Sequence, residues 1–181
     1  MISLAAWPVV FQVMLMARAA ALALPEVVIA LGSRPNSFGP VRRFSGNLTL
    51  VITGVMALFL LTPLSTFYIF VVQDMTAVVG ELAQTSLIYF LLFPAMATVI
   101  SWLRGLLINQ RRTRSVNMGM VINLGVTAVI LGVGLALRWP GLPTAALALN
   151  LAAAGEILYL GRRAQRSLPT ETPLFGRPKT V

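Results

Sequence analysis

The chain has 181 residues, of which 57% are hydrophobic and only 10% are charged, and its formal net charge is +9. With a mean hydropathy of +0.85, too little polar surface remains to cover a globule in water, which excludes an ordinary soluble domain. The sequence has no cysteine and no histidine, which excludes a thiol nucleophile, an imidazole base and the usual zinc and haem sites.

Long apolar stretches predict about five transmembrane helices, because a bilayer core about 30 Å thick needs roughly 20 apolar residues per helix. In chain order they cover residues 2–31, 44–61, 77–109, 116–137 and 144–160. We therefore expect an all-α integral membrane protein in which residues 1–166 form one transmembrane domain.

The residues that follow the first two stretches explain where these spans stop. Gly32 to Asn36 favour a turn after the first span. Pro63 ends the second span, because its missing N–H and its ring break helix continuity. The apolar and aromatic segment 65–72 is too short to cross the membrane, so we expect it to lie at the interface.

The third span is too long for a straight crossing. A helix over residues 77–109 would measure roughly 50 Å at 1.5 Å per residue, well beyond the hydrocarbon core. Pro94 lies in the middle of this stretch, where it removes one backbone hydrogen bond and disturbs the preceding turn. We predict that Pro94 kinks the helix and serves as a hinge.

The last two spans end in basic or helix-breaking residues. The fourth ends at Arg138, Trp139 and Pro140, and the fifth ends at Gly161, which two arginines follow. Residues 167–181 contain three prolines and lack a hydrophobic face, which predicts a disordered tail on the cytoplasmic side.

The distribution of basic residues predicts the orientation. They lie in the first loop, the third loop and the C-terminal region: Arg34, Arg42, Arg43, Arg111, Arg112, Arg114, Arg162, Arg163, Arg166, Arg177 and Lys179. The second loop carries Asp74 and no cation, and the fourth carries only Arg138. The positive-inside rule then places the N-terminus outside and the C-terminus in the cytoplasm of a multi-pass protein of the cell (inner) membrane. This topology and anionic membrane lipid account for the positive charge, so we expect no nucleic acid partner.

Arg18 lies near the middle of the first span. An arginine there costs about 2.5 to 3.5 kcal/mol, whereas each large apolar residue contributes only about 0.3 to 0.6 kcal/mol to insertion. A functional interpretation has its guanidinium facing an internal cavity that takes an anionic or phosphate-bearing substrate. A structural ion pair, with Glu26 or with a partner on another helix, fits the sequence equally well.

Glu156 is a second charged candidate within a span. It follows Ala148 and Ala152 on a stripe of small residues suited to close helix packing, so it should face protein. The carboxylate could carry a coupling proton or help to bind sodium. Its position near the end of the fifth span instead favours an ion pair with Arg162 or Arg163.

Polar residues mark two further faces. Gly119, Asn123 and Thr127 recur every four residues in the fourth span, which predicts a helix-packing seam from which Asn123 could also contact a substrate. Polar residues also line up in the third span and indicate a wet cavity on that face: Glu81, Gln84 and Thr85, then Thr98 and Ser101 beyond Pro94. A solvated helix start explains Glu81 equally well.

The acidic residues argue against an enzyme. They are scattered along the chain and form no close pair that would hold magnesium: Glu26, Asp74, Glu81, Glu156 and Glu171. There is also no Walker-type glycine-rich loop. We expect no catalytic residue, no cofactor and no metal, which leaves a small lipid-modifying enzyme as the weaker alternative.

Several segments follow one another in a recognisable order: Ala23 to Val28, Leu91 to Pro94, Trp102 to Leu107, Arg111 to Thr113, a span that carries Asn123, and a turn at Gly141 to Pro143. This order resembles the C-terminal lobe of the MOP exporter superfamily. The superfamily includes multidrug and toxin extrusion (MATE) proteins, polysaccharide and lipid-linked oligosaccharide flippases, and progressive ankylosis-type transporters.

The resemblance implies a fold and a function. Members have two six-helix lobes with the substrate in the cleft between them, so about five helices form most of one lobe of a MATE-like transporter. Because one lobe is missing, the resemblance leaves three alternatives. The chain is a truncated or split product, it pairs with a separately encoded N-terminal lobe, or it associates with itself. It would belong to a secondary transporter or flippase that exports an amphipathic or anionic substrate, either a small molecule or lipid-linked, by alternating access.

The resemblance gives roles to the residues singled out above. Arg18, Glu26, Asn123 and Glu156 are the candidates for substrate contact or ion pairing, and Pro94 is the candidate hinge. A non-transporting membrane scaffold or assembly subunit is the alternative function. It would use the same helices and polar groups only for packing.

The orientation can be tested directly, because the chain contains no cysteine. We predict that Asp74→Cys reacts with a membrane-impermeant maleimide added to intact cells, whereas Arg112→Cys reacts only after the membrane is permeabilised. The reverse labelling pattern would place the N-terminus in the cytoplasm. Labelling of both cysteines in intact cells would contradict a crossing between them.

Overall fold

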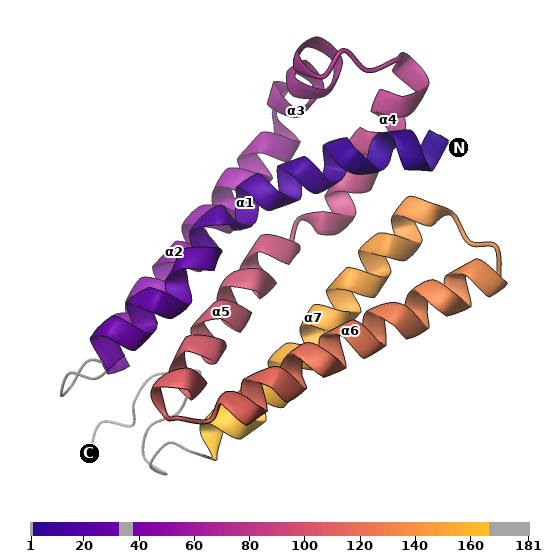
Figure 1. Ribbon diagram of the computed structural model, residues 1–181. Helices are drawn as coiled ribbons and strands as arrows, with labels where there is room; N and C mark the ends of the chain where they lie inside the picture. The colour runs from indigo at the N-terminus through magenta and orange to yellow at the C-terminus, as the bar shows by residue number, and fades with distance from the viewer. Residues whose placement is uncertain (1, 33–37, 167–181) are drawn as a thin grey trace.

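The computed structural model describes residues 2–32 and 38–166, which form helices and no strand. The helices are α1 (Ile2–Gly32), α2 (Phe38–Leu61), α3 (Leu64–Phe67), η1 (Tyr68–Val72), α4 (Ala77–Leu87), η2 (Ile88–Phe90), α5 (Phe93–Asn109), α6 (Thr113–Ala136) and α7 (Gly141–Gln165) (Figure 1). The all-α prediction is confirmed. Most of the predicted turn after Gly32 and the predicted tail at 167–181 lie outside the described residues.

Four of these helices, α1, α2, α6 and α7, are each long and apolar enough to cross a membrane, and the bent pair of α4 and α5 makes a fifth candidate. Large apolar side chains cover their outer surface. Leu50, Leu61, Leu124 and Leu135 are each more than 70% exposed, which is unusual for a protein surface in water. The fold therefore fits a multi-pass membrane protein.

The helices form two groups on either side of α5 (Figure 1). On one side, α1 packs along α5, and α2 contacts both of them. On the other side, α6 and α7 form an antiparallel hairpin in which α7 makes most of the contact with α5. One apolar core surrounds Met14 and Phe90, and a second surrounds Leu24, Leu103 and Leu160 nearer the turn between α5 and α6.

Three predicted spans were too short at their N-terminal ends. One is the fourth span, since α6 begins at Thr113 rather than at residue 116. The other two have a proline in their first turn. Helix α2 begins at Phe38 rather than at residue 44, and α7 begins at Gly141 rather than at residue 144. Pro40 and Pro143 fall in the first turns of these helices, where the missing N–H removes no helical hydrogen bond. Each proline therefore lies in the first turn of its helix instead of before it.

The C-terminal end of the fifth span also differs from the prediction. Helix α7 continues through Gly161 to Gln165 instead of ending at residue 160. Ala164 is completely buried, and Arg162 and Arg163 are good helix formers with long side chains that can reach polar surroundings. Packing of this last turn outweighs the weak helix propensity of glycine.

The predicted bend in the span over residues 77–109 is present next to Pro94, but it is a break between two helices rather than a kink within one. This stretch forms two helices, α4 and α5, bent by 42° at a break. The break lies at Leu91 and Leu92, and Pro94 occupies the first turn of α5 rather than the interior of a continuous helix. The proline thus lies in the first turn of the second helix of the pair.

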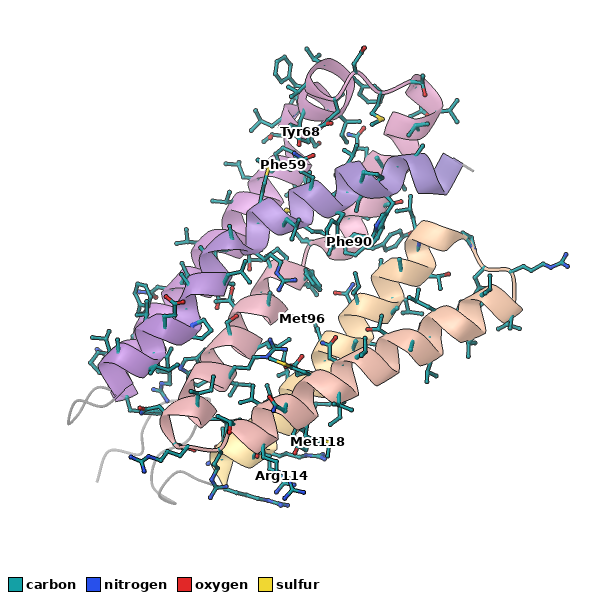
Figure 2. The ribbon with its side chains drawn as sticks, in the orientation of Figure 1. Phe59, Tyr68, Phe90, Met96, Arg114 and Met118 are labelled. Atoms are coloured by element: carbon teal, nitrogen blue, oxygen red, sulfur yellow. The ribbon has the colours of Figure 1, made fainter. Side chains whose placement is uncertain are left out.

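Backbone hydrogen bonding explains the position of this break. Because Pro94 has no N–H, the carbonyl of Phe90 has no donor four residues later. The preceding turn tightens, and the N–H of Leu91 donates to the carbonyl of Ile88 at 3.2 Å. Regular helical bonding resumes when the N–H of Met96 donates to the carbonyl of Leu92 at 3.1 Å. Figure 2 shows Phe90 and Met96 on either side of the break.

The short apolar segment after α2 forms α3 and η1 at one end of the helices, as Figure 1 shows. The ring of Tyr68 packs edge-on against Phe59 with 6.0 Å between ring centroids, and the two rings lie together in Figure 2. The amide of Gln73 donates a hydrogen bond of 2.8 Å to the Tyr68 hydroxyl. The segment is therefore held against the end of α2.

Gly105 permits the close approach of α5 to α1. A Cβ atom at this position would lie 2.8 Å from the Cβ of Val28 and 3.0 Å from the Cα of Pro25. We predict that Gly105→Ala lowers the free energy of unfolding by about 1 to 3 kcal/mol, because overpacking forces the helices apart. Thermal unfolding in detergent, followed by circular dichroism, measures the change.

Gly125→Ala is the matched control, because no neighbouring atom lies within 4 Å of its added Cβ. We expect this variant to unfold at or above the temperature of the unaltered protein, because alanine has the higher helix propensity. Equal melting temperatures for the two variants would contradict a tight contact between α1 and α5.

Candidate functional site

A cavity of about 390 Å³ lies between α1, α5, α6 and α7. Five polar side chains from these four helices line it: Arg18, Ser101, Arg104, Asn123 and Glu156. The other lining residues are apolar and include Leu22, Phe93, Ile100 and Leu149. The cavity therefore combines a small polar set with a mainly hydrophobic wall, as ligand pockets commonly do.

The buried centre of the polar set is Glu156, whose side chain is completely inaccessible to solvent. Arg104 donates from Nε to Oε1 of Glu156 at 2.7 Å, and its Nη2 lies 2.6 Å from the same oxygen. Asn123 donates from Nδ2 to Oε2 at 2.9 Å. Both carboxylate oxygens thus have partners, and the contacts join α5, α6 and α7.

The predicted pairing of Glu156 with Arg162 or Arg163 was wrong. Because α7 continues to Gln165, Glu156 lies roughly two and a half turns before the helix end rather than close to it. The guanidinium of Arg163 lies over the Tyr159 ring, 5.4 Å from its centroid. The expectation that Glu156 faces protein was correct.

The predicted seam in the fourth span faces α7. A Cβ atom on Gly119 would lie 2.9 Å from Leu160 Cδ2 and 3.5 Å from the Cγ of Glu156. The small residue therefore lets α6 and α7 approach closely enough for Asn123, one turn further along α6, to reach the carboxylate. Asn123 therefore contacts α7 within the packing seam and also lines the cavity.

Sequence reasoning did not single out Arg104. It follows Ala97 and Ser101 at spacings of four and three, and all three residues line the cavity. The sequence did contain a signal for this contact, because Arg104 places a positive charge within the third span and Glu156 places a negative charge within the fifth. Both spans end at the cytoplasmic side in the predicted topology, so the two charges lie on the same side of the bilayer centre.

Arg18 is half-buried and lines the same cavity. Its guanidinium lies over the Phe93 ring, 6.0 Å from the centroid, within the range of a cation–π contact. Its Nε atom is buried and has no hydrogen-bond partner. Within residues 2–32 and 38–166, Arg18 makes no ion pair.

The alternative in which Arg18 pairs with Glu26 was wrong. Glu26 is exposed on α1 and does not line the cavity. Three of the four sequence candidates, Arg18, Asn123 and Glu156, thus meet at one site, and the fourth lies elsewhere.

The electrostatics of the cavity follow from these contacts. Two arginines and one glutamate line it, which leaves one net positive charge. Arg104 is compensated by Glu156, so the uncompensated charge belongs to Arg18. A guanidinium with a free donor in apolar surroundings is suited to bind an oxyanion.

Pro94 is buried and does not line the cavity, although its neighbour Phe93 does. Any influence of Pro94 on a ligand therefore acts through the break that precedes α5. In the described part of the chain, no three acidic side chains gather in a way that could hold a metal ion.

Comparisons of the chain with known protein families, with curated proteins and with solved structures found no match. The resemblance to the MOP exporter superfamily therefore stays a prediction from the sequence.

The ion pair between Arg104 and Glu156 generates a stability prediction. Arg104→Leu leaves a fully buried carboxylate without its cation, which is expected to lower the free energy of unfolding by about 3 to 5 kcal/mol. The double variant Arg104→Leu with Glu156→Leu should regain most of this loss, because no buried charge is left unpaired. Chemical or thermal unfolding in detergent measures both.

Arg114→Leu is the control, because Arg114 is exposed near the start of α6 (Figure 2). We expect it to change stability by less than about 1 kcal/mol. If Arg104→Leu behaved like Arg114→Leu, the ion pair would not hold α5 against α7.

Proposed function

We propose that this chain is a subunit of a membrane transporter or flippase, and that its cavity binds an amphipathic anion on its way across the bilayer. The observation that carries the proposal is Arg18, a half-buried arginine with an orphaned buried Nε in a cavity of a membrane-type helical bundle. Charged side chains inside a bilayer are costly and mark substrate or ion pathways.

The lining of the cavity supports an amphipathic substrate. Arg18 provides the charge, and Leu22, Phe93 and Leu149 provide apolar walls. Asn123 and Arg104 are occupied by Glu156, so they help to shape the site while Arg18 contacts the anion. A fully ionic substrate would gain little from such walls.

A transport cycle also requires an element that can change shape. The break between α4 and α5 lies directly before Phe93 and Pro94, and Phe93 contacts both the cavity and Arg18. A change in the bend of this pair would move Phe93 relative to the anion site. Pro94 thus keeps its proposed role as the residue that fixes the hinge position.

The proposal places the chain as most of one lobe of a MOP-type exporter in the cell (inner) membrane, with an outside N-terminus. A separately encoded lobe or a second copy would complete the substrate path, and an ion gradient would supply the energy. Only 11% of the residues in the most apolar stretch of α6 are buried, so this helix leaves room for such a partner as well as for lipid.

A non-transporting scaffold or assembly subunit is the second candidate. The contacts of Glu156 with Arg104 and Asn123 favour it, because they join three helices as a structural clamp would. A scaffold has no need of Arg18 in an open cavity. The two functions therefore differ in what they require of this arginine.

Transport of a fluorescent amphipathic anion tests the proposal. Proteoliposomes that contain the chain, assembled with its partner lobe or with itself, are loaded with naphthyl sulfate, and its release is followed under an imposed proton or sodium gradient. Arg18→Ala should reduce release at least about tenfold, because one charge-assisted hydrogen bond contributes about 1.5 to 3 kcal/mol.

Arg138→Ala is the matched control, because Arg138 lies between α6 and α7 and outside the cavity. It should release the probe at the rate of the unaltered protein. Full release by Arg18→Ala would remove Arg18 from the substrate path and leave the scaffold as the better account.

A further inference from the structure

Resting on the proposed function, we infer that Glu156 sets the charge of the anion, so that the cavity accepts a singly charged oxyanion and rejects a doubly charged one. The charged groups that face the cavity are Arg18 from α1, Arg104 from α5 and Glu156 from α7, whereas α6 contributes the uncharged Asn123. These groups leave one net positive charge for the ligand to balance.

The geometry explains why Arg104 does not supply a second free charge. Its Nε and Nη2 both approach Oε1 of Glu156, at 2.7 Å and 2.6 Å. The Arg104 side chain is still 27% exposed and remains in the cavity wall. Arg104 therefore lines the site as a polar group whose charge is already balanced, and Glu156 acts as a fixed internal anion.

A singly charged oxyanion bound at Arg18 makes the whole site neutral. A doubly charged oxyanion would leave one net negative charge among apolar walls, where an unbalanced charge is strongly disfavoured. The predicted substrate class is thus a sulfate ester, a sulfonate, a carboxylate or a phosphodiester on an apolar body. Phosphate monoesters in their doubly charged form are excluded.

Two probes with the same apolar body measure this selectivity. Naphthyl sulfate carries one negative charge, and naphthyl phosphate carries nearly two at about pH 8, because the second pKa of a phosphate monoester is about 6. Binding of each to the full chain in phosphatidylcholine nanodiscs is measured by equilibrium dialysis, with empty nanodiscs as the blank. The unaltered protein should prefer the sulfate by at least about tenfold.

Glu156→Gln gives the cavity two net positive charges, and it should shift the ratio of the two affinities at least about tenfold toward the phosphate. Glu26→Gln is the matched control, because it makes the same change in net charge at an exposed position outside the cavity. The double variant Arg104→Gln with Glu156→Gln returns the cavity to one net positive charge. It should restore the preference for the sulfate although the ion pair is gone.

A measurement on the unaltered protein keeps the inference testable if Glu156→Gln fails to fold. At about pH 5, naphthyl phosphate is mainly singly charged, so its affinity should rise at least about tenfold relative to pH 8 while that of naphthyl sulfate stays constant. No gain for the phosphate would overturn the inference.

The same anionic group could belong to a soluble molecule or to a lipid head group. Nanodiscs in which one lipid in five, roughly, is phosphatidylglycerol distinguish the two sources, because this lipid is a singly charged phosphodiester. Weaker binding of naphthyl sulfate to the unaltered protein in these nanodiscs, at a salt concentration that screens the charge of the membrane surface, would identify a lipid head group. Unchanged binding would identify a soluble anion, and both results agree with the predicted charge.

Failure of the inference differs from failure of the proposed function. Equal affinities for both probes in the unaltered protein, or an equal shift in Glu26→Gln and Glu156→Gln, would overturn the inference while Arg18 could still bind anions. Undiminished binding of both probes by Arg18→Ala would overturn the anion site itself.

Discussion

The burial of the Glu156 carboxylate is the constraint on which the rest of the site depends. A carboxylate without solvent access in an apolar interior requires a cation and a partner for each oxygen. Arg104 and Asn123 meet this need from two different helices. These contacts hold the hairpin of α6 and α7 against α5, and residues of the three helices line the cavity.

This arrangement gives different roles to the two arginines that line the cavity. Arg104 is committed to a structural contact, whereas Arg18 faces the same cavity without an ion pair among the described residues. The cavity thus has a built-in anion and a remaining cation. Helices α5, α6 and α7 contribute polar side chains that contact one another in the cavity wall. Helix α1 contributes Arg18, the cation that we propose binds the ligand.

Much of the fold could be predicted from the sequence, because apolar stretches of membrane length need little tertiary information. The exceptions have local causes. Helices α2 and α7 begin earlier than predicted, and Pro40 and Pro143 occupy their first turns. The break before Pro94 falls at Leu91 and Leu92, because the missing N–H affects the carbonyl of Phe90 rather than the proline itself.

The site was predicted less completely. Arg18, Asn123 and Glu156 stood out because polar groups are rare within apolar spans. Arg104 also lies within a span, but its pairing with Glu156 was not predicted, because the two residues are 52 positions apart in the chain and their contact depends on how α5 packs against α7. Local spacing instead pointed to Arg162 and Arg163, which are nearer in sequence but do not line the cavity.

An anomalous-scattering experiment on crystals grown with bromonaphthyl sulfate would test the central claim most directly. The account predicts a bromine peak in the cavity between α1, α5, α6 and α7, with the sulfate group on the guanidinium of Arg18 and the contact between Arg104 and Glu156 intact. An empty cavity, with Arg18 paired to a carboxylate of a second copy or of another subunit, would contradict it.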